Sequence, residues 1–449
     1  MKTPIVDFVG AYAKSGRTRF HMPGHKGSMM LGCEPIDITE IDGADVLYRA
    51  EGIIKESEEN ATELFKTAQS FYSTEGSSLV IKAMLALVSR GGERGERPLI
   101  LAARNVHRAF VYASALLDLD VFWLMPDPDA HLCSCAVTAE DVEAAIQNSD
   151  RVPSAVYLTS PDYLGRIADV RAIAKVCHAN GVPLLVDNAH GAYLRFLKED
   201  LHPISLGADM CCDSAHKTLP VLTGGAYLHI AKAADPTYCR DAERMLSVFA
   251  STSPSYLILQ SLDLCNRYLA EKMERELERC VEEVARVKET LAKSGFVAEE
   301  SEPLKIVIQA NQYGYTGVEM AEHLRGYDVE AEMADGEYLV LMATPQNTQH
   351  DYRRLTVALA NLPIREPIKL SQDAWSKKAR RAERTIREAV LGRTERIPAK
   401  ESAGRLCGAP TVSCPPAIPI VMCGERIMAE DVARFARYGI DEVDVIVEE

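Results

Sequence analysis

The chain has 449 residues, of which 47% are hydrophobic and 26% charged, and its formal net charge is −15. This length is too great for one simple core and predicts two or three domains of an ordinary globular protein. The acidic balance argues against nucleic acid as a partner, because phosphate binding needs a basic surface.

The N-terminal stretch and the use of cysteine predict a cytoplasmic protein. Residues 1–16 contain no apolar core of signal-peptide length, and no run of about 18 apolar residues suggests a membrane span. The 12 cysteines include neighbours at 133–135 and 211–212, but neither pair has the spacing of a zinc site. We therefore expect buried, reduced thiols and no bound metal.

The middle of the chain alternates strands with helices. Thr138 is placed to cap a helix that follows the second strand, and Gly181 is placed to end a later helix. This alternation predicts an α/β fold with a mostly parallel sheet covered by helices on both faces. The strands are six short apolar runs at residues 99–102, 121–124, 155–159, 183–187, 209–213 and 226–230.

The remainder is predicted to form smaller α+β units. Apolar residues at helical spacing predict a long helix over 268–294, and strands are expected at 305–310 and 337–343. The segment 375–400 is rich in arginine and lysine, so it is either a nucleic-acid-binding arm or a solvated linking helix, and the acidic whole favours the helix. A final amphipathic helix is expected near 429–438.

Two stretches on or near the predicted sheet carry residues suited to a phosphate group and to a protonated ring nitrogen. Ser77 and Ser78 follow Gly76 at a helix start, where unpaired amides and hydroxyls suit a phosphate, although a simple serine cap explains them equally well. Asp187 ends an apolar strand, at the edge where open α/β sheets bind ligands. Its carboxylate either holds a proton on a ring nitrogen or caps a turn.

Two further stretches add a histidine and a lysine. His107 follows another strand end, and it either stacks on a flat ring or is a partly buried histidine. Ser214, His216 and Lys217 follow the run at 209–213; a lysine in a desolvated crevice is an amine nucleophile, whereas a lone lysine is usually a surface group. A phosphate cradle, a carboxylate, a histidine and a lysine together fit one cofactor, pyridoxal 5′-phosphate (PLP).

With these residues in view, the chain resembles the short form of the Orn/Lys/Arg decarboxylase family, whose members have the aspartate aminotransferase-like (type I) PLP fold. The similarity runs nearly end to end. Its motifs include "FHMPGHKG" (20–27), "ARNVHR" (103–108), "DNAHGAYLRF" (187–196), "SAHKTLP" (214–220) and "PPAIPIVMCGER" (415–426).

The resemblance implies decarboxylation of a basic L-amino acid to CO₂ and an amine: arginine to agmatine, ahead of lysine to cadaverine and ornithine to putrescine. Another type I reaction, such as transamination or a lyase reaction, and a catalytically inactive PLP-binding regulatory paralogue are the alternatives, because the fold alone allows them.

The resemblance also implies a division of the chain and an assembly. Residues 1–60 would form an N-terminal arm and the start of the PLP domain, 61–265 the large PLP-binding domain, 266–366 a small α+β domain, and 367–449 a C-terminal decarboxylase-type domain. Apart from its small-molecule substrate, the expected partner is a second copy of the chain. The homodimer, or a higher oligomer, would share its active sites at the interface.

The resemblance gives roles to the residues around the cofactor ring. Lys217 would form the Schiff base with PLP, and His216 would lie beside it. Asp187 would pair with the pyridine nitrogen, with His190 close by. His107 would stack on the ring.

The phosphate and substrate ends are also implied. Ser77, Ser78 and Ser214 would hold the phosphate, and Ser251 with Thr252 would reach the phosphate of a neighbouring subunit. Glu401 would meet the distal positive group of the substrate, or it is a surface acid.

This chain departs from the family pattern near the expected substrate. Glu75 places an acid beside the phosphate cradle, which disfavours phosphate binding unless its carboxylate points away. The departures are Glu75, Asn188, Gly224, Gly225 and Cys414.

Overall fold

The computed structural model describes residues 1–90, 96–128, 130–369, 380–411 and 416–448. The chain divides into two compact units. The first consists of residues 1–90 and 183–275, and the second of residues 91–182 and 276–449.

The central element is a seven-stranded sheet. Strand pairs β5–β6, β2–β3 and β2–β4 are parallel, whereas β7 runs antiparallel to both β6 and β1. The predicted α/β class and mostly parallel sheet are therefore confirmed, and all six predicted strands are present. In sheet order the strands are β1 (Gln69–Ser73), β7 (Ala226–Ile230), β6 (Met210–Asp213), β5 (Leu184–Asp187), β4 (Ala155–Thr159), β2 (Leu99–Ala103) and β3 (Asp120–Leu124).

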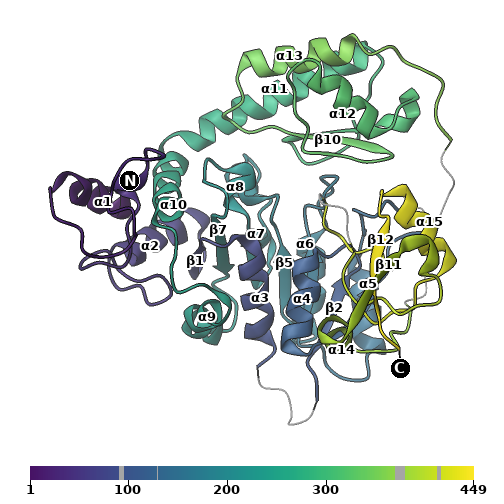
Figure 1. The fold of residues 1–449 in the computed structure, drawn as a ribbon, viewed down its shortest axis with the longest axis horizontal. Helices are drawn as coiled ribbons and strands as arrows, with labels where there is room; N and C mark the ends of the chain where they lie inside the picture. Colours follow the sequence, from purple (N-terminus) through teal and green to yellow (C-terminus); the bar gives the residue numbers. More distant parts are fainter. Residues whose placement is uncertain (91–95, 129, 370–379, 412–415, 449) are drawn as a thin grey trace. The chain divides into compact units, whose positions relative to one another are not determined.

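In the first unit, helices cover strands β1, β7 and β6. Helix α3 (Gly76–Val88) packs against β6 and β7, and α9 (Pro236–Phe249) packs against α3. Helices α1 (Pro4–Lys14), α2 (Ile53–Phe65) and α10 (Tyr256–Tyr268) lie side by side (Figure 1). Asp263 of α10 accepts the backbone N–H groups of Ile5 and Val6, each at 3.0 Å, so it satisfies amides that open α1. Two short helices, α7 (Pro203–Leu206) and α8 (Ala215–Thr218), flank β6 in the sequence.

Glu58 of α2 is a buried carboxyl group behind β1. Its Oε1 accepts the N–H of Tyr72 at 2.9 Å, and burial raises its pKa to about 8 from an ordinary 4.5. An acid whose folded pKa is raised contributes stability below its unfolded pKa, and this contribution is lost as the pH rises toward the folded pKa. Unfolding should therefore become easier between about pH 4.5 and about pH 8.

Glu58→Gln keeps the acceptor for Tyr72 and removes the ionisable group. We expect the variant to match the parent at about pH 5 and to exceed it by on the order of 3 kcal/mol in unfolding free energy at about pH 8. Denaturant unfolding of the cofactor-free protein at both pH values measures the difference. Glu63→Gln, at an exposed position of the same helix, is the control and should change neither value. Equal curves for the parent and Glu58→Gln at every pH would contradict the assigned pKa.

In the second unit, each sheet strand is followed by a capped helix. These helices are α4 (Arg108–Leu117), α5 (Ala139–Asn148) and α6 (Val170–Ala179). Thr138 caps α5 as predicted, in a capping box with Asp141. Helix α6 buries Val170, Ile173, Ala174 and Cys177, and the predicted stop Gly181 follows directly after its C-cap.

A smaller antiparallel sheet with three helices makes up a further part of the second unit. Strand β10 (Tyr338–Met342) pairs with β8 (Lys305–Gln309) and β9 (Met333–Ala334). Helix α12 (Gly317–Arg325) packs on β10 and on α13 (Gln349–Ala360) (Figure 1). The helix expected at 268–294 differs from the prediction: α10 begins at Tyr256, a π-helical segment covers Leu269–Met273, and α11 spans Glu274–Lys293.

The expected linking helix at 375–400 is wrong for residues 380–400, while residues 375–379 lie outside the described part of the chain. That region instead contains α14 (Ile386–Leu391) and β11 (Thr394–Pro398), separated at Gly392. Strand β11 pairs with β12 (Glu442–Ile446), where Arg396 and Asp444 form an ion pair at 3.1 Å. As a strand, β11 forms backbone hydrogen bonds with β12, and a helix over the same residues could not make this pairing. The predicted last helix is confirmed as α15 (Ala429–Arg437).

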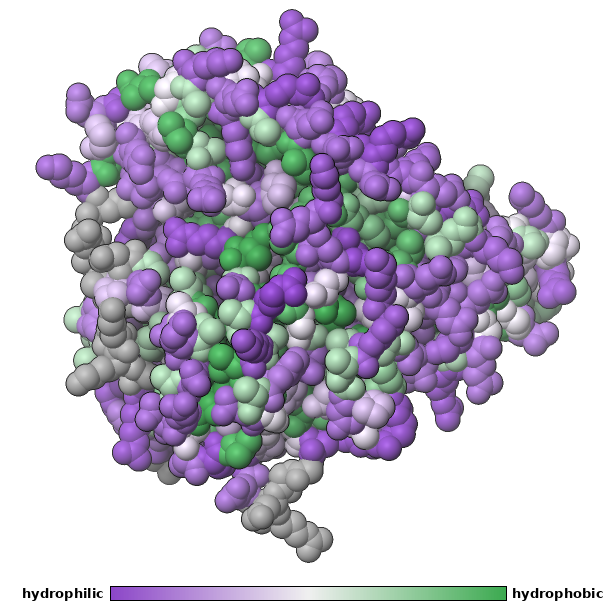
Figure 2. Space-filling view, turned by 180° about the vertical axis from the view of Figure 1, so that it is seen from behind, coloured by the Kyte–Doolittle hydropathy of each residue, from purple (hydrophilic) through white to green (hydrophobic). Residues whose placement is uncertain are grey.

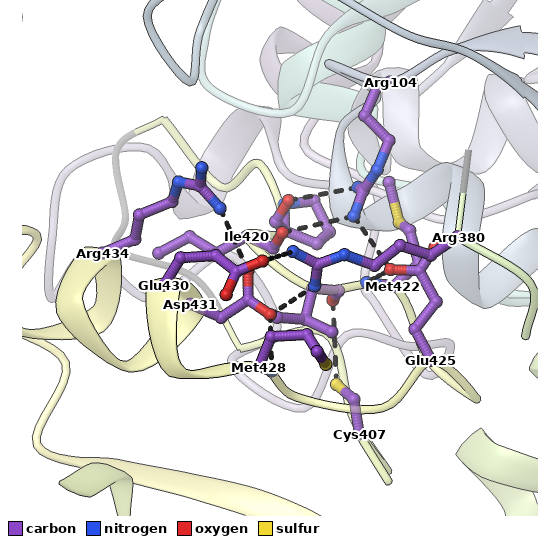
Figure 3. Close-up of polar contacts among 12 residues, drawn as sticks. Arg104, Arg380, Cys407, Ile420, Met422, Glu425, Met428, Glu430, Asp431 and Arg434 are labelled. Carbon is purple, nitrogen blue, oxygen red and sulfur yellow. Dashed lines mark hydrogen bonds and ion pairs between the residues drawn. The ribbon is translucent and has the colours of Figure 1, made fainter. Parts of the chain in front are cut away.

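A buried cluster of charges fastens the C-terminal segment within the second unit (Figure 3). Arg104, directly after β2, donates to the carbonyl oxygens of Pro419 and Ile420 and lies 3.3 Å from Glu425 Oε2. Asp431 accepts hydrogen bonds from Arg380 and, at 3.1 Å, from Arg434. Because buried charges are stable only when paired, the Arg104 contacts fix residues 419–425 to the end of β2, and Asp431 ties α15 to Arg380.

The expectation of buried thiols holds for eight of the eleven described cysteines, whereas Cys33, Cys135 and Cys239 are half-buried. Figure 2 shows a face that is mostly hydrophilic, with hydrophobic residues in small groups between polar ones. Within the described residues, every helix is too short or too polar to cross a bilayer. The eleven described cysteines are free thiols, and Cys414 lies outside the described ranges.

Candidate functional site

The ends of β5 and β6 bring the predicted carboxylate and lysine into one region. Asp187 is the last residue of β5 and is paired in register with Cys212 of β6. Ser214 follows β6 at once, and the single turn of α8 then carries His216 and Lys217. Parallel strands end at the same edge of a sheet, so these side chains lie at the edge where the ligand-binding crevice of open α/β sheets forms.

Lys217 has a defined partner in this crevice. Its Nζ lies 2.9 Å from Nε2 of His190, a buried residue in the loop that follows Asp187. An ammonium group only donates, so with the lysine protonated His190 Nε2 is the acceptor. His216 Nδ1 lies 3.1 Å from the carbonyl oxygen of Gly225, which sets Nδ1 as the protonated nitrogen of that ring.

The start of α3 carries the two serines that the sequence analysis assigned to a phosphate. Ser77 and Ser78 occupy its first turn, and the Ser214 hydroxyl donates to Ser77 Oγ at 2.7 Å. The capping position, Glu75, makes no side-chain cap, so the first amides of α3 are not covered by that residue. Space is open in front of Gly76, where an added Cβ would meet nothing within 4 Å. Amides, hydroxyls and a helix N-terminus are a donor set for a phosphate.

Gly224 forms a backbone contact with the loop that leads into α3. Its carbonyl oxygen accepts the N–H of Gly76 at 2.7 Å. Its φ of +100° lies in the region that favours glycine, and a Cβ there would stand 2.9 Å from the carbonyl oxygen of Thr74. This departure from the family pattern is therefore required by the close approach of the two loops.

Glu75 points toward a different segment. Its Oε1 accepts the N–H of Ser251 at 2.7 Å, so the carboxylate faces the exposed stretch that contains Ser251 and Thr252. This hydrogen bond engages one carboxylate oxygen of Glu75. The link was invisible in the sequence because the two residues are 176 positions apart.

Two predicted site residues belong to the second unit. His107 is the N-cap of α4, and its Nδ1 accepts the N–H of Ala109 at 3.1 Å. Glu401 is exposed at the end of the 3₁₀ turn Ala399–Glu401.

Sequence reasoning missed a buried polar network on β6 and β7. Asp213 Oδ2 lies 3.0 Å from His202 Nε2 and 3.3 Å from His229 Nε2, while Asn188 Nδ2 donates to Asp213 Oδ1 at 2.6 Å. Burial alone would raise the pKa of Asp213, but the charges and hydrogen bonds of the two histidines outweigh it and hold that pKa well below its usual range. Asn188 stood out in the sequence only as a departure from the family pattern, and Asp213, His202 and His229 did not stand out at all.

Two members of this network, together with the neighbouring Cys211, have the side chains of a possible metal site. His202, Cys211 and Asp213 offer ligand atoms within 4.8 Å of one another. The distance from His202 to Asp213 is that of a hydrogen bond, and Asp213 accepts from Asn188 as well. The geometry is therefore satisfied by hydrogen bonds among the protein groups themselves.

The residues of the first unit fit pyridoxal phosphate. An uncovered helix start with hydroxyls matches a phosphate, a buried carboxylate matches a protonated ring nitrogen, and a lysine beside a histidine matches a Schiff-base amine. A fold and a set of residues of this kind are those expected of a type I PLP-dependent enzyme.

Comparison with known proteins gives the family. The model "Orn/Lys/Arg decarboxylase, major domain" matches residues 3–357, and that of the C-terminal domain of the same family matches residues 369–438. The chain belongs to the Orn/Lys/Arg decarboxylase family and is a PLP-dependent amino-acid decarboxylase.

Similar proteins cover nearly the whole chain. It is 30% identical to the uncharacterized protein YaaO of Bacillus subtilis, over 97% of this chain and 94% of that protein. An arginine decarboxylase of the same organism is 28% identical, over 96% of this chain and 92% of the relative. Among solved structures, lysine decarboxylases of Francisella novicida and E. coli have TM-scores of 0.79 and 0.78. These two are 17% and 18% identical, each covering 99% of this chain and 81% and 82% of the other, and they support the fold.

Proposed function

We propose that this chain decarboxylates L-arginine to agmatine and CO₂, with lysine and ornithine as poorer substrates. The observation that carries the proposal is Lys217 Nζ, 2.9 Å from His190 Nε2, on the turn after the strand that adjoins buried Asp187. Relatives named arginine decarboxylase support the choice of substrate.

The proposed roles follow from chemistry at each position. When bound, PLP supplies an electron sink that lets the bond between Cα and the carboxyl carbon break. Asp187 holds the proton on the pyridine nitrogen, and Ser77, Ser78 and Ser214 bind the phosphate. Lys217 carries the cofactor covalently, and Lys217 or His216 returns a proton to Cα. From the second unit, His107 is proposed to stack on the ring.

A substrate panel tests this proposal. The purified holoenzyme is given each common amino acid in turn, and amine products are measured by mass spectrometry. We expect kcat/KM to be highest for arginine, followed by lysine and ornithine. Preference for a neutral or acidic amino acid would overturn the substrate assignment and direct attention to Glu75, Gly224 and Gly225.

Glu401 is proposed to bind the distal cation of the substrate. A carboxylate accepts two hydrogen bonds from a guanidinium, so Glu401→Gln should raise KM for arginine by roughly 10-fold. The kcat and the affinity for PLP should stay unchanged, because neither depends on the distal group. Glu442→Gln, at another exposed acid of the second unit, is the control. A KM equal to that of the control would make Glu401 a surface acid.

We also propose a homodimer with shared active sites. Ser251 and Thr252 are exposed, and the segment is held by Glu75 at the edge of the cradle, which supports a role in reaching a second subunit. Phe20, Met30 and Leu31 are 93%, 85% and 89% exposed, and apolar side chains so placed favour burial against a partner.

The free thiols support a reducing compartment such as the cytoplasm.

Mixed dimers test the shared site. Lys217→Ala and Thr252→Arg subunits are each expected to be inactive, but a hybrid dimer contains one site with neither change. Random mixing should therefore restore about a quarter of the parental activity. If each site is built within one chain, every site keeps a lesion and mixing restores nothing. Unmixed samples of each variant, treated identically, are the controls.

A further inference from the structure

We propose that strand β6 positions the Asp187 carboxylate through two side-chain pairs, one on each face of the sheet, which makes Cys212, Asn188 and Asp213 positioning residues. This inference rests on the proposed function, in which Asp187 meets the pyridine nitrogen. The two pairs join successive residues of neighbouring chain segments: Asp187 with Cys212, and Asn188 with Asp213.

The first pair lies on the face that carries Asp187. Cys212 Sγ is 3.3 Å from Asp187 Oδ1, and the same oxygen accepts the N–H of Ala189 at 3.2 Å. A carboxylate only accepts, so the thiol is the donor. Cys212 is completely buried, and burial together with the nearby Asp187 charge raises its pKa well above the ordinary value. This direction favours the protonated thiol, which is the form that donates a hydrogen bond.

The second pair lies on the opposite face, because successive residues of an extended chain point to opposite sides. The Asn188 side chain donates to Asp213 at 2.6 Å, and its backbone N–H continues the ladder to the carbonyl oxygen of Cys212 at 3.0 Å. Gly191 makes room for it, since a Cβ there would stand 2.0 Å from Asn188 Oδ1. Asn188 is thus fixed by its side chain, its backbone and its packing.

Asp213 is a rigid anchor for this second pair. His202 and His229 approach its other oxygen at 3.0 and 3.3 Å, and the Ser70 hydroxyl lies 2.8 Å from His229 Nδ1. All four side chains are buried. Several polar contacts that converge on one buried carboxylate in a low-dielectric interior hold that carboxylate firmly.

Together the pairs remove the freedom of the turn at residues 187–189. Asp187 cannot rotate without losing the thiol, and the backbone cannot shift without breaking the Asn188–Asp213 bond. A carboxylate that stabilises a ring proton acts best when its orientation is set before the reaction begins. We therefore expect these pairs to act on cofactor binding and kcat, and to leave KM for the substrate nearly unchanged.

The first test compares Cys212→Ala with Cys212→Ser, and uses Cys265→Ala, at a buried cysteine of α10, as the matched control. Titration of cofactor-free protein with PLP gives the dissociation constant, and thermal unfolding gives the packing cost. We expect Cys212→Ala to weaken PLP binding about fivefold and to lower kcat by a similar factor, because one hydrogen bond to a charged group is lost. Cys212→Ser should restore both. Cys265→Ala should lower the unfolding temperature without changing either.

The second test is Asn188→Asp, which sets a carboxyl group at hydrogen-bond distance from Asp213. Two buried carboxylates so close cannot both be ionised, so PLP affinity should become dependent on pH and fall as the pH rises. The parent, titrated over the same pH range, is the comparison.

The outcomes separate this inference from the proposed function. If the parent fails to bind PLP, the proposed function fails. If the parent binds PLP and turns over substrate, but Cys212→Ala behaves like Cys265→Ala and Asn188→Asp follows the parental pH profile, the positioning inference alone is overturned.

Discussion

Lys217→Ala is expected to lose the covalent attachment of PLP and to reduce turnover by more than roughly 10³-fold. Lys217 is the lysine of α8, directly after the buried strand β6, and its amine lies beside His190. No other group on that turn can form a Schiff base. The yellow colour of the holoenzyme should therefore be absent from the variant.

Borohydride reduction followed by peptide mass spectrometry gives a readout independent of activity. In the parent, the reduced cofactor should remain on the peptide that contains Lys217. Lys198→Ala, at an exposed lysine of the same unit, is the control and should keep both the label and the activity. A Lys217→Ala protein that retains the label and the turnover would show that another lysine carries the cofactor.

Asp187→Asn is expected to bind PLP and to turn over about 10²- to 10³-fold more slowly. The asparagine fills the same space and keeps an acceptor for Ala189, but its charge is gone. A neutral side chain no longer favours the protonated pyridine nitrogen, so the cofactor withdraws electrons less strongly. PLP titration together with kcat measures the two effects separately.

Asp187→Glu distinguishes charge from placement. This variant keeps the charge but moves it by one methylene, so it should lie between the parent and Asp187→Asn in kcat. A near-parental rate for Asp187→Asn would remove Asp187 from the proposed pairing with the ring.

The buried strands were the part of the fold that the sequence predicts best. Strands covered on both faces are continuous apolar runs, and residues 184–187 and 210–213 are of this kind. Strand β1, "QSFYS", was not predicted because its serines are polar. They are buried all the same: Ser70 bonds to His229, and Ser73 donates to the carbonyl oxygen of Gly76. These partners come from tertiary structure and leave no local signal.

The candidate site also contains residues that the sequence indicates and residues whose partners only the structure reveals. Lys217, Asp187 and Ser77 stand in short motifs with recognisable spacing, so sequence alone indicates them. Glu75 and Asn188 looked like isolated departures, because their partners Ser251 and Asp213 are remote in the chain. Hydrogen bonds between residues that are distant in the sequence can be identified only from the three-dimensional structure.

The central claim is that this chain releases CO₂ from arginine, and carboxyl-labelled L-arginine tests it most directly. The purified holoenzyme is incubated with the labelled substrate, and labelled CO₂, agmatine and keto acid are quantified together. We predict one CO₂ and one agmatine for each arginine consumed, with no keto acid. Formation of a keto acid or of ammonia without CO₂, or no turnover of arginine, lysine and ornithine by protein that carries bound PLP, would contradict the claim.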